Sequence, residues 1–242
     1  GKTTLLRIIS GLEIPENGTI TLEKEILNND KIFIVPEKRN CSLVFQSYAL
    51  FPNLTVNENI LFGKNSSQNK ELIQSLFEIT RIEKLKNRYP HEISGGQQQR
   101  VSLVRALATN PSLLLMDEPL SNLDQELRYR IRSEIVQLLR NLGTTTLIVS
   151  HDTEDALAIS DKIIILKNGS VVQEGSPQEI YNKPSSKYAA LLFGKSNFIP
   201  SKSYPVITKN IIRNENGEKF ISIRPGQLRI FHKSEIKNKG FL

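Results

Sequence analysis

Leu113-Leu114-Leu115-Met116-Asp117-Glu118-Pro119 constrains the fold of this chain more than any other stretch. Its four consecutive apolar residues indicate a strand that is buried on both faces, which is typical of the centre of a parallel sheet. Two adjacent carboxylates, Asp117 and Glu118, follow at the C-terminal end of the strand, where open α/β sheets bind their ligands. Asp117 can hold Mg²⁺ through water, and Glu118 can act as a general base on an attacking water. Acidic residues in an ordinary strand-end turn would explain this stretch, taken alone, equally well.

The segments around this strand predict a parallel α/β sheet. We expect one helix to begin near Gln97 and to end before Asn110-Pro111. A longer helix follows, with Asp124 as its N-cap and Gly143 at its C-terminal stop. Thr146–Val149 is the next apolar strand. Helices that alternate with buried strands form the βαβ units of a parallel sheet.

The N-terminal half predicts further helices and short strands. Gly1-Lys2-Thr3-Thr4 opens a helix that ends near Ser10-Gly11. Residues 55–88 are expected to be helical, because Thr55 and Glu58 form a capping-box pattern before an apolar run. Between these helices we expect short strands over Thr19–Leu22, Lys31–Val35 and Ser42–Phe45.

The C-terminal third of the chain changes character. Asn168-Gly169 is a strong hairpin signal, with strands expected over Lys162–Leu166 and Ser170–Gln173. Two short helices should follow, over Gln178–Tyr181 and Lys187–Phe193. After Gly194 the pattern predicts short strands with a turn at residues 214–217, and therefore an all-β tail.

The charge of the chain is concentrated in that tail. The 242 residues include 32 Lys and Arg and 25 Asp and Glu, which gives a formal charge of +7. Residues 195–242 carry ten basic and three acidic side chains, so this last fifth holds the whole net charge. The abrupt change indicates two regions, residues 1–194 and 195–242.

Composition excludes several other classes of protein. Hydrophobic residues make up 38% of the chain and charged residues 24%, which is a globular balance rather than that of a disordered segment. No apolar run approaches the roughly 18 residues that are needed to span a bilayer. The single cysteine, Cys41, excludes an internal disulfide framework.

A phosphate-binding element is expected where the first helix begins. Gly1-Lys2-Thr3 matches the second half of a P-loop. A helix N-terminus presents unpaired N–H groups and the positive end of its dipole, Lys2 adds a mobile charge, and Thr3 offers a hydroxyl to Mg²⁺. The three residues alone would also fit an ordinary helix start with a solvated lysine.

A second anion site is expected at Ile93-Ser94-Gly95-Gly96-Gln97-Gln98-Gln99-Arg100. Ser94 and Gln97 have the spacing of a capping box, which is itself a sufficient structural reason for both residues. The two glycines between them would allow a ligand to approach the backbone closely.

Taken in order, these stretches resemble the motifs of the nucleotide-binding subunits of ATP-binding cassette (ABC) transporters. Gly1-Lys2-Thr3-Thr4 is similar to the end of Walker A, and Leu113–Pro119 to Walker B with its glutamate. Residues 94–100 resemble the ABC signature. The remaining matches are Gln46 with the Q-loop glutamine, Ser121-Asn122-Leu123-Asp124 with the D-loop, and His151 with the switch histidine. Six motifs in the right order leave little room for chance.

The resemblance implies a head-to-tail dimer in which each ATP lies between the Walker motifs of one subunit and the signature of the other. The catalytic residues would be Glu118, His151 and Gln46. ATP would be bound by Gly1, Lys2, Thr3, Thr4, Gln46 and His151, and across the dimer interface by Ser94, Gly95, Gly96, Gln97 and Asp124. The metal, Mg²⁺, would be held by Thr3, Gln46 and Asp117.

The importer branch of the family offers the nearest resemblance. Tyr48-Ala49-Leu50-Phe51-Pro52, together with Val56, Asn59-Ile60 and Phe62-Gly63, is similar to importer subunits for iron, polyamines, sulfate, molybdate or sugars. Residues 222–226 with Leu228 resemble the start of their accessory β-barrel, the TOBE domain. The implied fold is an α/β P-loop ATPase over residues 1–194, with a mixed sheet, an antiparallel β arm and an inserted helical subdomain at about 55–108. The start of a small all-β barrel would follow over residues 195–242.

The resemblance also implies the function and the partners. The chain would bind and hydrolyse ATP to power import of a small solute, as a peripheral subunit on the cytoplasmic face of the inner membrane. Its partners would be a second ATPase subunit, permease subunits contacted near Gln46–Pro52, and an extracytoplasmic substrate-binding protein. The cargo is not encoded in these motifs.

An ABC ATPase that acts on nucleic acid or the ribosome is the alternative, since a basic tail suits nucleic acid. We nevertheless expect no nucleic-acid partner. The chain lacks the long coiled coil or tandem cassette of those relatives, and Tyr48–Pro52 matches importers better. A P-loop kinase is disfavoured by the signature and by the Walker B glutamate.

The first residue, Gly1, falls inside the Walker A motif, and the one methionine is Met116, so we expect the sequence to be part of a longer protein. The front of the P-loop and the adenine-stacking aromatic would then lie outside it. We therefore predict that the 242-residue chain alone binds ATP weakly or not at all. Isothermal titration calorimetry measures this directly, and a micromolar dissociation constant would refute the prediction.

Overall fold

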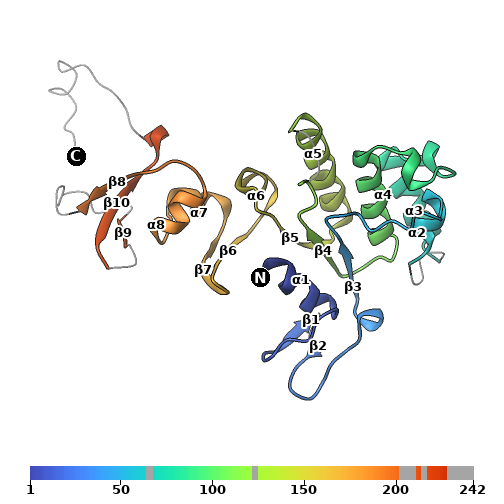
Figure 1. Cartoon of the computed structure of the whole chain (residues 1–242), viewed down its shortest axis with the longest axis horizontal. Helices are drawn as coiled ribbons and strands as arrows, with labels where there is room; N and C mark the ends of the chain where they lie inside the picture. The colour runs from blue at the N-terminus through green and yellow to red at the C-terminus, as the bar shows by residue number, and fades with distance from the viewer. Residues whose placement is uncertain (64–67, 122–124, 202–210, 214–216, 228–242) are drawn as a thin grey trace. The chain divides into compact units, whose positions relative to one another are not determined.

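The computed structural model describes residues 1–63, 68–121, 125–201, 211–213 and 217–227. The chain forms two compact units, Gly1–His151 and Asp152–Leu242. Figure 1 shows the helices and strands of both units. The boundary expected between residues 194 and 195 remains a prediction.

A parallel sheet forms the centre of the first unit. Its strands are β3 (Cys41–Val44), β4 (Leu113–Asp117) and β5 (Thr145–Val149), in the order β3-β4-β5. Both strand pairs are parallel, with Val44 opposite Met116 and Asp117 opposite Val149. Leu114, Leu115 and Met116 of β4 are buried and Leu113 is half-buried. Both faces of the strand are covered, because Leu115 packs with Leu6 of the first helix, whereas Leu114 and Met116 belong to the core formed with the other helices.

Helix α1 (Lys2–Ser10) packs against this sheet, where its Leu6 is buried with Leu115 and Val149. The helix ends as predicted at Gly11, which has a left-handed φ of 84°. The buried guanidinium of Arg39 donates to the carbonyl oxygens of Ile8 and Ile9, at 2.8 and 2.7 Å. Arg39 thus supplies donors to two carbonyls of the last helical turn, and the Ile8 carbonyl also accepts from the Gly11 N–H at 3.1 Å.

The antiparallel arm follows α1 and differs from the predicted strands. Its strands are β1 (Ile20–Leu22) and β2 (Glu25–Asn28). The strand expected over Lys31–Val35 is wrong. The Asn29 side chain accepts hydrogen bonds from the backbone N–H groups of Lys31 and Ile32, at 2.9 and 2.7 Å, and fixes a turn there.

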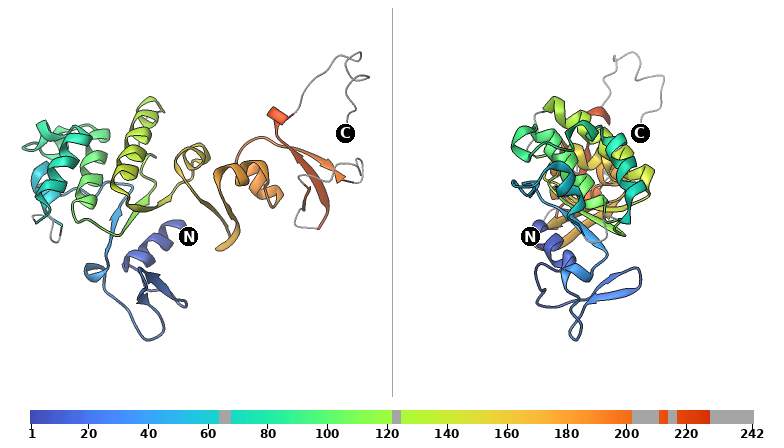
Figure 2. Two further views of the ribbon diagram at one scale, coloured as in Figure 1. Left: turned by 180° about the vertical axis from the view of Figure 1, so that it is seen from behind. Right: turned by 90° about the vertical axis from the view of Figure 1, so that its right-hand side faces the viewer.

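Helices α2 (Val56–Leu61), α3 (Lys70–Thr80) and α4 (Gly95–Leu107) lie between β3 and β4 in the sequence and form one group. The left view of Figure 2 shows this group as the cyan-to-green helices. The helix expected over residues 55–88 is therefore at least two helices. The capping box of Thr55 and Glu58 is confirmed, and its hydrogen bonds lower the pKa of the Glu58 carboxyl.

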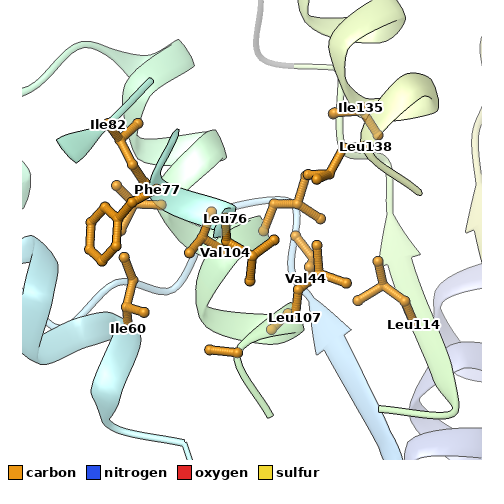
Figure 3. Close-up of a cluster of buried hydrophobic side chains, with 14 of the residues drawn as sticks. Val44, Ile60, Leu76, Phe77, Ile82, Val104, Leu107, Leu114, Ile135 and Leu138 are labelled. Atoms are coloured by element: carbon orange, nitrogen blue, oxygen red, sulfur yellow. The ribbon is translucent and has the colours of Figure 1, made fainter. Parts of the chain in front are cut away.

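One apolar core connects these helices to the sheet and to α5 (Gln125–Leu142). Figure 3 shows Phe77, Leu76 and Ile82 facing Ile60 and Val104, while Leu107, Val44 and Leu114 continue the cluster toward Ile135 and Leu138. Helix α5 ends at Gly143, which has a φ of 62°, as its sequence predicts. Short 3₁₀ helices cover Pro36–Lys38, Glu83–Leu85, Pro90–Glu92 and Pro225–Gln227.

The second unit begins with α6 (Thr153–Ile159), an additional helix whose N-cap is Asp152. The hairpin of β6 (Ile163–Lys167) and β7 (Ser170–Gly175) is confirmed, with Asn168 and Gly169 both at positive φ. The two short helices α7 (Pro177–Asn182) and α8 (Lys187–Leu192) are also confirmed.

The described part of the tail contains short strands, as predicted, and their pairing is antiparallel. Strands β8 (Asn197–Pro200), β10 (Lys219–Ile223) and β9 (Ile211–Arg213) form a sheet in that order. Buried Arg224 follows β10 and donates to the carbonyl oxygens of Tyr181 and Ala190, at 3.1 and 2.8 Å. Burial lowers the pKa of this guanidinium. These bonds attach the end of β10 to the helical segment before the tail.

The architecture confirms an α/β cassette with an antiparallel arm and a helical insertion. Parallel and antiparallel pairs occur in separate sheets of the described chain. Among the residues that the structure describes, no helix is both long enough and apolar enough to cross a membrane.

Leu114 offers a test of the core. It lies fully buried in β4, with 0% of its surface exposed. Leu114→Ala should lower the free energy of unfolding by about 2–5 kcal/mol, because the substitution leaves a cavity between sheet and helices. Chemical denaturation followed by circular dichroism measures this loss. The control Leu12→Ala, at a site that is 46% exposed, should cost less than about 1 kcal/mol, and equal losses would contradict the assignment.

Candidate functional site

The carboxyl ends of the three parallel strands bring the expected site residues together. Gln46 follows β3, Asp117 and Glu118 lie at the end of β4, and Ser150 and His151 follow β5. Because the strands are parallel, all three chain exits lie at one edge of the sheet. This edge is where open α/β sheets bind ligands.

The N-terminus of α1 contacts the same edge. The Thr3 hydroxyl donates to Asp117 Oδ1 at 3.2 Å, and Lys2 Nζ donates to the carbonyl oxygen of Ser150 at 2.9 Å. Asp117 is buried, whereas Gly1, Lys2, Thr3 and Thr4 are exposed. The described start of the helix therefore places a hydroxyl, an ammonium group and free N–H donors next to a carboxylate.

Glu118 is the centre of a second set of contacts. His151 Nδ1 lies 3.0 Å from Glu118 Oε2, and Gln46 Nε2 donates to the same oxygen at 3.4 Å. Gln46 Nε2 also donates to Ser121 Oγ at 3.2 Å. We call Gln46, Glu118, Ser121 and His151 the Glu118 cluster.

The backbone of Glu118 is held in an unusual conformation. Its φ is 47°, in the left-handed region, which costs about 1–2 kcal/mol for a residue with a side chain. The Glu118 N–H donates to the carbonyl of Val149 at 2.9 Å, and Ser121 Oγ donates to the Glu118 carbonyl at 2.9 Å. The fold thus fixes the direction of this carboxylate, and such strain is common at functional sites.

The oxygen atoms of Thr3 and Asp117 fit Mg²⁺. This ion prefers hard oxygen ligands and is usually bound by one or two carboxylates together with substrate phosphates. In the described parts of the chain no three His, Cys, Asp or Glu side chains gather as a complete metal cage. A hydroxyl and one buried carboxylate beside a lysine suit a metal that arrives with a phosphate ligand.

The residues expected to act across a dimer lie elsewhere, at the start of α4. Ser94 Oγ accepts from the Gln97 N–H at 3.4 Å, and the Gln97 side chain accepts from the Ser94 N–H at 2.8 Å. Ser94 and Gln97 therefore form the capping box that their spacing predicts. A Cβ added at Gly95 would meet no atom within 4 Å, so the space in front of this exposed glycine is open. Gly96 is buried in the first turn, and Asp124 lies outside the described residues.

The segment after Gln46 forms an unexpected turn. Tyr48 and Ala49 have φ values of 62° and 46°, although neither is glycine. Arg105 of α4 donates to the Tyr48 and Ala49 carbonyl oxygens at 3.0 and 2.7 Å. Next to this turn the exposed rings of Phe51 and Phe62 lie 4.3 Å apart, centroid to centroid.

Sequence reasoning missed three residues that contact this site or the loop that follows Gln46. Ser121 lies in the expected D-loop, so the motif itself could have indicated it. Ser150 accepts from Lys2 through its backbone, and Arg105 reaches a loop that is more than fifty residues away in the sequence. No local pattern marks these last two residues.

Comparison with known families agrees with the geometry. The family described as ABC transporter matches residues 1–121, half of the chain. The chain belongs to the ABC transporter family. The match includes the described residues at the start of α1, the Gln46 loop, the start of α4 and the end of β4.

Curated members of the ABC transporter family resemble the chain beyond that match. The spermidine/putrescine import ATP-binding protein PotA of Bacillus cereus is 40% identical over 95% of this chain and 66% of that protein. The sulfate/thiosulfate import ATP-binding protein CysA 2 of Chromobacterium violaceum is 45% identical over 84% and 55%. The Fe(3+) ions import ATP-binding protein FbpC of Fusobacterium nucleatum is 41% identical over 95% and 65%. The chain thus spans about two thirds or less of the length of these relatives.

Solved ABC structures share the fold. CbiO1 from Clostridium perfringens, part of the ABC transporter complex cbiONQ, has a TM-score of 0.66 and 27% identity, and 74% of each chain is covered. The ATP-binding cassette MJ0796, in a dimeric post-hydrolysis state bound to ADP and Pi, has a TM-score of 0.59 and 31% identity. That match covers 73% of this chain and 81% of MJ0796.

Proposed function

We propose that the protein that carries this chain is the ATP-binding and ATP-hydrolysing subunit of an ABC importer for a small solute. The Glu118 cluster is the observation that carries the proposal. The Glu118 carboxylate is contacted by an imidazole and an amide, and a lysine at a helix start contacts the same edge of the sheet through the Ser150 carbonyl. These are the parts that phosphoryl transfer to water requires.

ATP would bind with its phosphates at the N-terminus of α1. Gly1, Thr3 and Thr4 present backbone N–H groups there, and Lys2 turns from the Ser150 carbonyl to the phosphates. Thr3, Asp117 and Gln46 would hold Mg²⁺, which when bound neutralises developing phosphate charge. The 3.2 Å contact of Thr3 with Asp117 supports the first two of these ligands.

Glu118 would act as the general base. Its carboxylate takes a proton from the attacking water as the water oxygen bonds to the γ-phosphorus, and the bond to the ADP oxygen breaks. His151 and Gln46 orient this carboxylate, because both contact its Oε2. His151 would also contact the γ-phosphate.

A second copy of the protein would complete the site. Ser94, Gly95, Gly96 and Gln97 of that copy would bind the same ATP, since the open space at Gly95 allows a phosphate to approach the backbone. Asp124 would act across the same interface. The solved MJ0796 structure is a dimer bound to ADP and Pi, which supports this assembly by analogy.

Import is favoured by the names of the relatives, which are import ATP-binding proteins for polyamines, sulfate or thiosulfate, and Fe(3+). The exposed Phe51 of the Gln46–Pro52 loop would contact the permease, together with the exposed Phe62 whose ring lies next to it. An extracytoplasmic binding protein would choose an ion, oxyanion, polyamine or sugar as the cargo. The subunit would then be peripheral, on the cytoplasmic face of the membrane.

The basic tail is proposed to be part of a TOBE-type β domain over residues 195–242. The antiparallel sheet β8-β10-β9 supports this. No nucleic-acid partner is proposed, because the relatives are named for import. The proposed β domain also accounts for the basic tail without such a partner. An ABC ATPase acting on nucleic acid or the ribosome would instead copurify with them rather than with a permease.

Glu118→Gln tests the proposed chemistry in the whole protein. The amide cannot accept the proton, so ATP turnover should fall by about 10²–10⁴-fold while ATP-bound dimers accumulate. Phosphate release and size-exclusion chromatography with ATP measure the two effects.

The exposed carboxylate Glu16 supplies a matched control, and Glu16→Gln should leave both quantities unchanged. A Glu118→Gln protein that hydrolyses ATP at nearly the parent rate would remove Glu118 from the role of base.

A further inference from the structure

The turn that follows Gln46 has a backbone shape that its sequence does not favour. Tyr48 and Ala49 both adopt left-handed φ values, and two successive residues with side chains rarely do so. The Tyr48 N–H donates to the Phe45 carbonyl at 3.0 Å and closes the turn. Without glycine at either position, the turn depends on contacts from outside its own segment.

Arg105 supplies such a contact. One guanidinium reaches two successive carbonyls, with Nη1 at 2.7 Å from the Ala49 oxygen and Nη2 at 3.0 Å from the Tyr48 oxygen. Its Cζ also lies 5.6 Å from the centre of the Phe51 ring. Desolvation lowers the pKa of this arginine, which nevertheless stays charged, and both bonds are charge-assisted.

The helix that carries Arg105 also contacts the other loop of the site. Gln99 of α4 is buried, and its side-chain Nε2 donates to the carbonyl of Pro119, the residue after Glu118. Helix α4 thus bonds to the segments that follow both Gln46 and Glu118. The side chains of these two residues contact each other at 3.4 Å.

We infer that Arg105 is a positioning residue that holds the Tyr48–Ala49 turn against α4, so that the turn and the helix move as one body. The inference rests on the proposed function, in which this turn faces the permease and the start of α4 serves the ATP of a second subunit. Docking of a permease on the turn then shifts Ser94 and Gly95 through α4. The two hydrogen bonds of the Arg105 guanidinium connect the turn to the helix. We call this pair of bonds the link.

The geometry of these two hydrogen bonds suits an arginine at position 105. A planar guanidinium presents several donors in a fixed fork, whereas a lysine ammonium is a point charge on a flexible stem. Arg105→Lys keeps the charge and most of the packing but cannot hold both carbonyls with one rigid group. Arg105→Ala removes the link altogether. The exposed Arg88, which forms an ion pair with Glu92, provides the matched control Arg88→Lys.

The test uses the whole ATPase subunit, alone and assembled with its permease in lipid nanodiscs. Hydrogen–deuterium exchange of residues 46–52 reports the turn. The ratio of the ATPase rate in the complex to that of the subunit alone reports the coupling. Melting temperatures identify any variant that fails to fold. If Arg105→Ala fails to fold, Arg105→Lys is compared with the parent protein instead.

We expect Arg105→Ala to speed exchange at residues 46–52 and to lower the coupling ratio by at least about fivefold, the lower end of typical allosteric couplings. The rate of the subunit alone should stay within about twofold, because Arg105 touches neither nucleotide nor reacting atoms. Arg105→Lys should fall between parent and Arg105→Ala, and Arg88→Lys should match the parent.

The inference would be overturned if hydrogen exchange at residues 46–52 were unchanged in Arg105→Ala. It would also be overturned if the coupling ratio were unchanged in both Arg105 variants. A parent protein that hydrolyses no ATP would contradict the proposed function instead. In that case the exchange measurement still decides whether Arg105 holds the turn.

Discussion

The parallel pairing of β4 with β3 and β5 is the constraint that organises the rest of the site. The C-terminal ends of all three strands therefore lie at one edge of the sheet. Residues far apart in the sequence meet there, around the carboxylates of Asp117 and Glu118. The apolar run of β4 makes this possible, because a strand buried on both faces must lie inside the sheet. The contacts of Glu118 with Gln46 and His151 follow from that placement.

Helix α4 adds a second level of organisation. Its N-terminus is capped by Ser94 and leaves open space at Gly95, while its body bonds to the residues after Gln46 and after Glu118. Arg100 of the same helix pairs with Glu134 of α5 at 2.8 Å. One helix therefore connects the proposed partner-facing loop, the proposed general base Glu118 and the surface proposed for a second subunit. These connections need no net charge, and the basic residues that give the chain its +7 lie in the tail.

Much of the fold could be predicted because its signals are local. The apolar runs of β4 and β5, the capping boxes at Thr55 and Ser94, and Asn168-Gly169 each act within a few residues. The misses have non-local or unusual causes. Strand β2 follows a turn at Glu23 and Lys24, which have positive φ without glycine, and the side chain of Asn29 replaces the expected next strand by a turn. The site motifs were readable in order, but the Tyr48–Ala49 turn is held by a residue of α4 that no local pattern indicates.

The decisive experiment is a structure of the Glu118→Gln protein with Mg²⁺ and ATP. We expect two copies with ATP between them. The phosphates should contact Lys2 and Thr3 of one copy and Ser94 and Gly95 of the other. A nucleotide bound away from the start of α1, or a single copy that encloses its ATP without a partner, would contradict this mechanism.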